Sequence, residues 1–467
     1  MSVSPARWAA FKALGAVLDR RAEPAAALER ARAGLADPRD RALAAELVSG
    51  TLRWLAAIDH VIVRQARRPL ERIQPAVLNA LRLGAYQLLY LTRIPPRAAV
   101  DEAVETVRRA GAERAAGFVN AVLRRVAVTR AEPPWPPRPD PSRASRDELL
   151  DYLAITLSYP RWLAARRLDR FGFTGAEAWI RFDNTPAPIT LRANRLRVDR
   201  DALAAALAAE GIETRPARYA PDGLIVTSGN PLRSSLASRG FFVVQDEASQ
   251  LIAHACGARP GERVLDACAA PGGKTLGLVA DMEDQGLVVA ADVRPRRLDL
   301  LRRTLEPLGA RSVRLVRLTL LQPMPCLPVF DCVLVDAPCS GLGTLRRDPD
   351  VKWRRGEADL PRFAEAQLGM LRHAAEAVRP GGRLIYATCS SEPEENDDVI
   401  ERFLATQPVF RPAPIVLPAP AGGLPSVVDD RGRLRTLPHI HGLEAFFAAA
   451  LVKDRETARG LVPPEGL

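Results

Sequence analysis

The sequence has little cysteine and no long apolar run. Its six cysteines, at positions 256, 268, 326, 332, 339 and 389, include no CxxC pair and have no cluster of histidines beside them. This spacing argues against a disulfide framework and a structural zinc site, so we expect reduced thiols and no metal. No apolar run reaches the roughly 18 residues that a membrane-spanning helix requires. The first 20 residues lack the apolar core and cleavage site of a secretory signal, which predicts a cytosolic protein.

The chain is long enough to form several domains, and its charge is uneven. It has 467 residues, of which 47% are hydrophobic, so it can bury more than one core and we expect two to four domains. Residues 1–130 hold 22 basic and 12 acidic side chains, a net charge of +10, whereas residues 241–467 hold 28 and 30, a net charge of −2. The basic first third favours a polyanion as its partner, although a solvated arginine-rich surface is the alternative.

Most of the first third is predicted to be helical. Apolar residues recur three and four positions apart from residue 5 to about residue 127, as in segment 76–90, and strand-like alternation is scarce. We therefore predict an all-helical domain over residues 1–130. The proline-rich run 132–141 that follows can form neither a helix nor a central strand, which predicts an extended linker over residues 131–145.

Two further domains are predicted after this linker. A helical pattern from 146 to about 169, a strand pattern at 189–194 and an alanine-rich helix at 199–211 indicate a small α+β module over residues 146–235. From there strands alternate with helices, which is typical of a Rossmann-like α/β domain with a mostly parallel sheet, predicted over residues 236–460. Its predicted strands are 263–267, 287–291, 313–317, 331–336 and 383–388, with a closing pair near 408–416 and 446–452.

A loop of small residues is the first candidate binding feature of the α/β domain. The segment 267–275 reads ACAAPGGKT and lies between a predicted strand and a predicted helix. Gly272 and Gly273 permit close approach of the backbone, and the free N–H groups at the helix start favour a negatively polarised ligand. The next strand ends at Asp292, which can accept hydrogen bonds from ribose hydroxyls. Loop and acid together predict a nucleoside cofactor, either NAD or S-adenosylmethionine.

Two cysteines follow later strands of the same sheet and narrow the chemistry. Cys339 lies in VDAPCSG after one strand, and Cys389 lies in YATCSS after the next. Methylation of cytosine at C5 requires a thiolate to add to C6, so that C5 can attack a sulfonium methyl group. Asp336 is placed to hydrogen-bond or protonate N3, and the second thiol can help to expel the first. Hydride transfer needs no pair of thiols, which favours S-adenosylmethionine; buried structural thiols are the alternative.

These segments together resemble the RNA cytosine-5 methyltransferases of the RsmB/NOP class, over nearly the whole chain. The resemblance rests on the loop at 267–275, DAPCSGLG at 336–343, DVKW at 350–353, YATCS at 386–390 and, upstream, QDEASQ at 245–250. It implies a methyltransferase that modifies a cytosine of 16S ribosomal RNA, with S-adenosylmethionine as cofactor. It also implies a NusB-like RNA-binding fold for residues 1–130 and an RNA-recognition-like fold for residues 146–235.

The resemblance further implies roles for individual residues. Cys389 is expected to be the covalent nucleophile and Cys339 to assist release, whereas in DNA cytosine-5 methyltransferases the Pro-Cys cysteine, here Cys339, attacks instead. Asp336 and Lys274 complete the expected catalytic set. The expected cofactor-binding residues are Ala267, Cys268, Ala269, Ala270, Pro271, Gly272, Gly273, Lys274, Asp292 and Asp336. We expect a monomer that binds small-subunit ribosomal RNA and neither a membrane nor a metal.

Departures from the family pattern keep other functions open. The third strand and its exit, residues 313–320, contain no acid where the family offers one to the adenine, and EAFF at 444–447 replaces an expected Asp-Gly-Phe-Phe. One alternative is a non-catalytic RNA-binding or ribosome-assembly factor with a decayed methyltransferase fold, and a second is C5 methylation of another ribosomal or transfer RNA. Adenine-N6 methylation is disfavoured, because DAPC at 336–339 lacks a stacking aromatic. The loop at 348–354 either holds RNA or lies on the surface.

Overall fold

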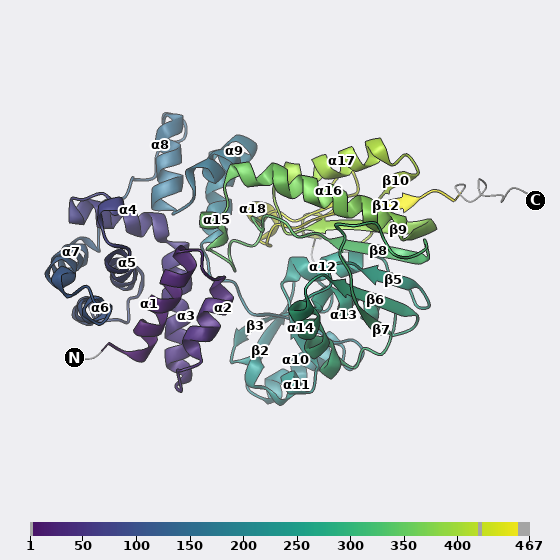
Figure 1. The fold of residues 1–467 in the computed structure, drawn as a ribbon, viewed down its shortest axis with the longest axis horizontal. Helices are drawn as coiled ribbons and strands as arrows, with labels where there is room; N and C mark the ends of the chain where they lie inside the picture. Colours follow the sequence, from purple (N-terminus) through teal and green to yellow (C-terminus); the bar gives the residue numbers. More distant parts are fainter. Residues whose placement is uncertain (1–2, 419–422, 456–467) are drawn as a thin grey trace, which may run out of the picture. The chain divides into compact units, whose positions relative to one another are not determined.

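The computed structural model describes residues 3–418 and 423–455, and the chain divides into two compact units. Unit 1 comprises Met1–Pro186 together with Leu345–Glu357, and unit 2 comprises Ala187–Thr344 together with Ala358–Leu467. Figure 1 shows that unit 1 is built from helices and that unit 2 contains two sheets with flanking helices. No helix in the described ranges combines the length and the apolar character needed to cross a membrane.

Helices form the first part of unit 1, which confirms the predicted all-helical domain. They are α1 (Pro5–Leu18), α2 (Pro24–Arg32), α3 (Pro38–Arg53), α4 (Leu55–Ala66), α5 (Pro75–Tyr90), α6 (Pro96–Arg109) and α7 (Ala116–Thr129), with short 3-10 turns η1 (Leu70–Arg72) and η2 (Glu113–Ala115). Five of them begin with proline, which suits a first turn because no N–H donor is needed there. Asp37 also caps α3 by accepting a hydrogen bond from the Arg39 amide.

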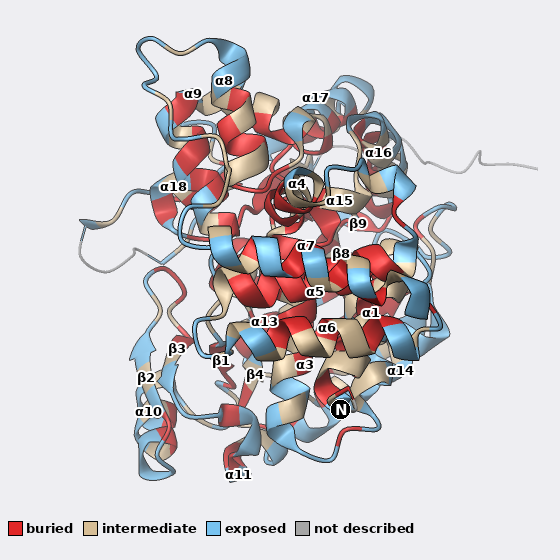
Figure 2. Cartoon of the chain, turned by 90° about the vertical axis from the view of Figure 1, so that its left-hand side faces the viewer, coloured by how far each residue is buried: buried red, intermediate tan, exposed pale blue. Residues whose placement is uncertain are grey.

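The core of this part is built around α5. That helix is buried along most of its length, and Figure 2 shows helices of this unit with buried faces in red and exposed faces in blue. Gly50 of α3 faces Tyr86 of α5, because a Cβ at Gly50 would lie 2.0 Å from the Tyr86 hydroxyl oxygen. Gly84 of α5 faces Leu123 of α7 in the same way, at 2.6 Å. Larger side chains at either glycine would force the helices apart.

The proline-rich segment contains no helix or strand from residue 131 to residue 140, and it packs within unit 1. Trp135 stacks on Tyr90 with ring centroids 6.0 Å apart, and its Nε1 donates a hydrogen bond to the Ala57 carbonyl oxygen at 3.1 Å. The compact unit ends at Pro186, well past this segment. The division into domains at 1–130, 131–145, 146–235 and 236–460 therefore stays a prediction.

The rest of unit 1 is also helical. It contains α8 (Arg146–Asp151), the π-helical turn η3 (Tyr152–Thr156), α9 (Arg161–Asp183) and α15 (Val351–Arg354). α8 begins with a capping box between Ser145 and Glu148. α9 runs on past the predicted end near residue 169 through Gly172, whose φ of 65° breaks the helical geometry. Because glycine adopts positive φ at little cost, the second half of the helix can change direction there.

A small antiparallel sheet opens unit 2. Its strands β1 (Thr190–Ala193), β2 (Glu213–Pro216), β3 (Gly223–Ser228) and β4 (Phe242–Val244) are arranged in the order β2-β3-β1-β4. α10 (Arg200–Ala209) and α11 (Ser235–Ser238) accompany them, with η4 (Pro231–Arg233) between β3 and α11. The strand predicted at 189–194 and the helix predicted at 199–211 are confirmed. Asp199 caps α10 by accepting a hydrogen bond from the Ala202 amide.

The large sheet of unit 2 confirms the predicted Rossmann-like domain. Its strands are β5 (Arg263–Asp266), β6 (Leu287–Asp292), β7 (Val313–Arg317), β8 (Phe330–Asp336), β9 (Val378–Thr388), β10 (Phe410–Ala413), β11 (Leu434–Arg435) and β12 (Phe447–Lys453). The order is β10-β12-β9-β8-β5-β6-β7, and β11 pairs with β12. The pairs among β5 to β9 are parallel, and β12 is antiparallel to both β9 and β10. The sheet is therefore mostly parallel, as predicted.

Helices bury both faces of this sheet. They are α12 (Glu247–Ala255), α13 (Gly273–Asp281), α14 (Pro295–Leu305), α16 (Leu360–Glu376), α17 (Asp397–Thr406) and α18 (Pro438–His441), with 3-10 turns η5 (Glu306–Leu308), η6 (Glu357–Asp359) and η7 (Pro393–Glu395). Val264 of β5 packs in one core with Leu251 of α12, whereas its neighbour Leu265 packs in the other with Leu368 of α16. Since both faces are covered, the ends of the strands are left for ligands.

Candidate active site

The carboxyl ends of β5, β8 and β9 bring most of the predicted site residues to one edge of the large sheet. β8 pairs in parallel with both of the other strands, so their ends share this edge. The loop 267–272 leaves β5 there, Asp336 ends β8 and Cys389 follows β9. In open α/β sheets this edge is where ligands and reacting groups collect.

The loop after β5 is shaped by two glycines. Gly272 precedes α13 with φ of 111°, and a Cβ there would lie 2.9 Å from a side chain of α14. A Cβ at Gly273 would lie 3.1 Å from the side chain of Gln245. Both positions therefore favour glycine, the first by backbone conformation and the second by space. The close approach of this loop to a ligand stays a prediction.

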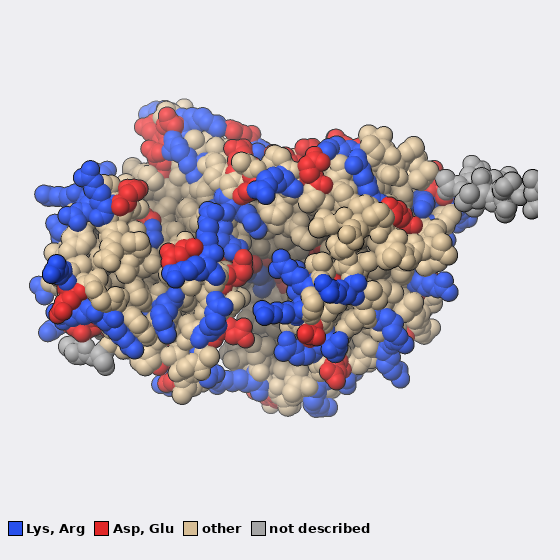
Figure 3. Space-filling view, in the orientation of Figure 1, with Lys and Arg blue, Asp and Glu red and all other residues tan. Residues whose placement is uncertain are grey.

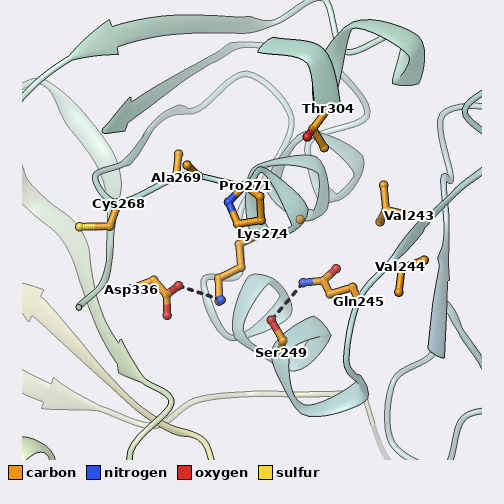
Figure 4. Close-up of a pocket in the computed structure, with 12 residues that line it drawn as sticks. Val243, Val244, Gln245, Ser249, Cys268, Ala269, Pro271, Lys274, Thr304 and Asp336 are labelled. Atoms are coloured by element: carbon orange, nitrogen blue, oxygen red, sulfur yellow. Dashed lines mark hydrogen bonds and ion pairs between the residues drawn. The ribbon is translucent and has the colours of Figure 1, made fainter. Parts of the chain in front are cut away.

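A cavity of about 320 Å³ opens beside this loop. It is lined by Val243, Val244, Gln245, Ser249, Cys268, Ala269, Ala270, Pro271, Gly273, Lys274, Thr304 and Asp336. Figure 4 shows Lys274 and Asp336 directed toward each other, with Gln245 and Ser249 joined by a hydrogen bond nearby. Of the predicted cofactor residues, Ala267, Gly272 and Asp292 do not line it. A cavity walled by this glycine-containing loop and a Lys–Asp pair fits a nucleoside cofactor with a charged tail.

The acid at the end of β6 is buried and already has partners. Oδ2 of Asp292 lies 3.1 Å from Nε of Arg297, and Oδ1 accepts a hydrogen bond from the Arg294 amide at 3.2 Å. The exit of β7 carries no acid, and the α14 wall of the cavity presents Thr304 instead. The ribose role predicted for Asp292 therefore stays a prediction.

Lys274 and Asp336 form an ion pair in the lining of this cavity. Nζ of Lys274 lies 2.8 Å from Oδ2 of Asp336, and it also lies 5.7 Å from the centroid of the Phe446 ring. Burial is the largest single influence on Lys274 and lowers its pKa, but the charge of Asp336, its hydrogen bond and smaller contributions from nearby groups together outweigh burial, and the net shift is upward. Lys274 is therefore held as an ammonium ion beside the carboxylate.

The structure brings the two predicted cysteines into contact. Sγ of Cys339 lies 3.2 Å from Sγ of Cys389, although the residues are 50 positions apart. The hydrogen bond between the two sulfurs, with Cys339 as the donor, raises the pKa of Cys339 well above its ordinary value, and burial adds to this shift. One of the two sulfurs therefore retains a proton when the other ionises.

The segment 348–354 was predicted either to hold RNA or to lie on the surface. Its central residues instead are buried within unit 1. Val351–Arg354 forms the short helix α15 in unit 1, and Asp350 and Lys352 are buried. Nε1 of Trp353 donates a hydrogen bond to the Leu52 carbonyl oxygen. The signature at 350–353 therefore acts as an internal anchor of unit 1.

Sequence reasoning missed several residues of this edge. Gln245, Ser249 and Thr304 line the cavity but were not assigned a role, although QDEASQ at 245–250 was noted as a family segment. Glu395 was also missed, although it stands six positions after Cys389 and is fully buried. An acidic residue in a run of Glu and Pro gives no signal of burial by itself.

The chain is similar to known methyltransferases of ribosomal RNA. Residues 253–452 match the family described as 16S rRNA methyltransferase RsmB/F. A probable ribosomal RNA small subunit methyltransferase B of Bacillus subtilis is 36% identical over 89% of this chain and 91% of its own length. The chain belongs to the RsmB/F family. It is therefore an RNA methyltransferase of a family that methylates ribosomal RNA with S-adenosylmethionine.

Further matches extend over the other parts of this RsmB/F-family protein. Residues 4–128 match the NusB family, and residues 159–233 match the ferredoxin-like domain of RsmF/B-like methyltransferases. The ribosomal RNA small subunit methyltransferase B of Pseudomonas putida is 34% identical over 96% of this chain and 98% of its own. Residues 4–128 are thus similar to NusB proteins, and residues 159–233 are similar to a domain found in RsmF/B-like methyltransferases.

Solved structures agree with the family. The crystal structure of PH0851 matches 97% of this chain and 100% of its own, with 26% identity and a TM-score of 0.78. NSun6 from Pyrococcus horikoshii, solved with SFG, matches 63% of this chain and 98% of its own, with 20% identity and a TM-score of 0.56. The second likeness shows a shared fold alone.

Proposed function

We propose that this RsmB/F-family protein transfers a methyl group from S-adenosylmethionine to C5 of a cytosine in 16S ribosomal RNA, cytosine 967 by family resemblance, through a covalent adduct between Cys389 and C6. The observation that carries the proposal is the contact between the thiols of Cys339 and Cys389 at the strand ends. C5 methylation needs one thiol to activate the ring and a second group to complete release. Adenine methylation and hydride transfer need no such pair.

The first step uses Cys389 as the nucleophile. Its thiolate adds to C6 of the cytosine, which forms the Sγ–C6 bond and makes C5 nucleophilic. Asp336 stands at the same edge with the Lys274 ammonium group beside it, so a proton held by this pair can be donated to N3 and stabilise the charge that develops in the ring. Lys274 keeps Asp336 in place through their 2.8 Å ion pair. The target base must be unpaired or flipped out, because the thiolate attacks the face of the ring.

The second step uses Cys339. Once Cys389 is bonded to C6, the hydrogen bond that most strongly raises the pKa of Cys339 is lost, so Cys339 can release its proton to solvent. The Cys339 thiolate then takes the proton from C5 after methyl transfer. The C5–C6 double bond forms, and the Sγ–C6 bond breaks with its electron pair returning to Cys389. The 3.2 Å contact places the two sulfurs within reach of one base, and the order, with attack by Cys389 and release by Cys339, rests on the family resemblance of the Thr-Cys motif.

The loop 267–273, Lys274 and Asp336 are the residues proposed to hold the cofactor. S-adenosylmethionine supplies the electrophilic methyl group when bound. This assignment is supported by the cavity of about 320 Å³ beside the loop and by the Lys274–Asp336 pair that lines it. A protein of similar fold, NSun6, was solved with SFG, an analogue of this cofactor, which agrees with it.

The RNA is proposed to contact the NusB-like helices of unit 1. A cavity of about 760 Å³ there is lined by Arg68, Arg72, Arg114, Phe118 and their neighbours. These three arginines are exposed, and within the described ranges none of them pairs with an acid. Figure 3 shows basic side chains gathered over the part of unit 1 where Figure 1 places α4 and α7. Unpaired guanidinium groups around a groove favour a phosphate backbone as the ligand.

Bisulfite sequencing of ribosomal RNA tests the proposal directly. Cells with and without the gene are compared, and complementation with the wild-type chain is the control. We expect one cytosine of 16S RNA to resist deamination only when the protein is present. An unchanged ribosomal RNA, with a resistant cytosine in another RNA instead, would show that the reaction is right and the substrate wrong. Loss of a methylated adenine would contradict the chemistry.

A further inference from the structure

A buried carboxylate joins the two loops that carry the cysteines. Glu395 lies in η7 after β9 and is fully buried. Its Oε1 accepts a hydrogen bond from the Ser340 amide at 2.7 Å, and its Oε2 accepts hydrogen bonds from the hydroxyls of Ser340 and Ser390. These serines directly follow Cys339 and Cys389. A single side chain therefore contacts both loops next to the reactive sulfurs.

Two further side chains keep this carboxylate from moving. Nε2 of Gln367, on α16, donates hydrogen bonds to Oε1 of Glu395 at 2.9 Å and to the Pro338 carbonyl oxygen at 3.0 Å. The hydroxyl of Tyr386 donates its proton to the Glu395 carbonyl oxygen at 2.6 Å and lies 3.1 Å from Oε1 of Gln367. The loop before Cys339 is thereby tied to the same group. Since Gln367 and Tyr386 are fully buried on regular elements, the network has a rigid base.

The environment of Glu395 is unusual for a buried acid. Within the described residues it forms no ion pair with Lys, Arg or His, and the side-chain oxygens accept hydrogen bonds from the neutral donors Ser340, Ser390 and Gln367. Taking a carboxylate out of water costs free energy, which an apolar side chain of similar size avoids. Packing alone therefore gives no reason for an acid here. What the acid offers is a set of acceptor positions shared by donors of both loops.

We propose that Glu395 is a positioning residue that holds the Cys339 and Cys389 loops together, so that the two sulfurs stay in contact when the enzyme releases its product. The release role rests on the proposed function, whereas the spacing of the sulfurs does not. Glu395 reaches neither the base nor the cofactor cavity through any contact described above. It acts through Ser340 and Ser390.

The spacing is tested without RNA or cofactor. Phenylarsine oxide captures two adjacent thiols by forming two As–S bonds and releasing one molecule of water, so it reports whether the sulfurs are in contact. We expect wild-type protein to bind it, and Cys339→Ala to set the background from the other cysteines. Glu395→Ala should slow capture about 100-fold, the effect of roughly 1 Å of misplacement. Glu395→Gln should capture faster than Glu395→Ala, because its amide oxygen still accepts from the Ser340 amide and Gln367.

Two further variants guard against a change in folding. Ser390→Ala removes only the hydroxyl that links Glu395 to the Cys389 loop, and it should slow capture in a protein that keeps the charge. Glu262→Gln is the matched control, because Glu262 accepts from Arg383 and from the Arg259 amide near the amino end of the sheet. It should lower the unfolding temperature and leave capture unchanged. Equal effects of Glu262→Gln and Glu395→Ala would overturn the proposal.

Single-turnover reactions with target RNA test the release role. We expect Glu395→Ala to form the covalent protein–RNA adduct and to resolve it about 100-fold more slowly than wild type. Wild-type capture and wild-type release in Glu395→Ala and Ser390→Ala would overturn the proposal. Slow capture in Glu395→Ala, with no RNA adduct in the wild-type enzyme, would support the positioning of the sulfurs and overturn the proposed function instead.

Discussion

The amide of Gly343 donates a hydrogen bond to the carbonyl oxygen of Cys389 at 2.9 Å, which joins the two cysteine loops through their backbones. A Cβ at Gly343 would lie 2.7 Å from this oxygen and 1.9 Å from the Ala445 carbonyl oxygen. Because both oxygens belong to the backbone, they cannot move aside without displacing the chain. Gly343→Ala must therefore move the Cys339 loop. We expect methyl transfer, measured in single-turnover assays with labelled S-adenosylmethionine, to fall about 100-fold.

Gly369→Ala is the control for this substitution. Gly369 lies in α16, and a Cβ there meets nothing within 4 Å. Alanine in a helix interior is favoured over glycine by roughly 0.5–1 kcal/mol, so this variant should be slightly more stable and fully active. Full activity of Gly343→Ala would show that the close packing of this loop is not needed for the reaction.

The order of the two cysteines predicts opposite phenotypes. Cys389→Ala should abolish methyl transfer and adduct formation, because no nucleophile remains for C6. Cys339→Ala should still form the adduct and should accumulate it, because the C5 proton is not removed. Denaturing gels of protein incubated with target RNA and S-adenosylmethionine measure the adduct. A Cys339→Ala enzyme without adduct, beside a Cys389→Ala enzyme with one, would reverse the assignment.

Asp336→Asn tests the acid at the end of β8. The variant removes the charge that raises the pKa of Lys274 and leaves the ammonium group without its partner. We expect a fall of about 100-fold or more in the methyl-transfer rate, typical of losing a group that stabilises developing charge. Asp331→Asn is the control, because Asp331 lies near the other end of β8 and pairs with Arg379. If both variants lose activity equally, Asp336 has no special role.

The regular elements of unit 2 were predictable because each is encoded locally. The strands β5, β6 and β8 are short apolar runs, and the loop 267–275 can be recognised by its small residues. That the thiols of Cys339 and Cys389 share one edge also followed from the alternation of strands and helices. Their direct contact did not, because it depends on the loops after the strands.

Partners far apart in sequence were beyond prediction. The burial of Lys352 depends on Arg53 and Asn184, which are 299 and 168 positions away. Trp135 looked like part of a linker, but its ring packs on Tyr90 and anchors the segment. Such contacts follow from tertiary packing, which overrides local composition.

The arginine-lined cavity of unit 1 predicts a change in salt dependence. Replacing Arg68, Arg72 and Arg114 by Gln together should weaken binding of 16S RNA fragments, and it should reduce the slope of log affinity against log salt by roughly 0.7 for each lost phosphate contact. Fluorescence anisotropy at several salt concentrations measures both. A weaker affinity with an unchanged slope would contradict contact with phosphates.

The control for this triple variant removes the same charge elsewhere on unit 1. Arg97, Arg108 and Arg161 are paired with acids, at Asp101, at Glu105, and at Asp147 and Asp151. Their joint replacement by Gln lowers the net charge equally, but these guanidinium groups are already engaged. A larger loss of affinity in the control would place the RNA on another face.

Lys352 is predicted to stabilise unit 1. Its Nζ is buried and donates hydrogen bonds to the carbonyl oxygens of Arg53 and Ser158, at 2.9 and 2.7 Å, and to Oδ1 of Asn184 at 3.0 Å. Lys352→Met leaves three buried acceptors without this donor, so we expect the free energy of unfolding to fall by about 3 kcal/mol. Lys12→Met, at an exposed position of α1, is the control and should change stability little.

The same lysine predicts how this stability depends on pH. Burial lowers the pKa of Lys352 from 10.5 to about 7, against the opposing charge of Asp183. The folded chain then binds this proton more weakly than the unfolded chain, so stability rises with pH between these two values and is flat below the lower one. Titrations common to both proteins cancel in the difference between wild type and Lys352→Met. That difference in unfolding free energy should grow from about pH 7 to about pH 10. A difference that stays flat over this range instead would mean that the three acceptors hold Lys352 as an ammonium ion.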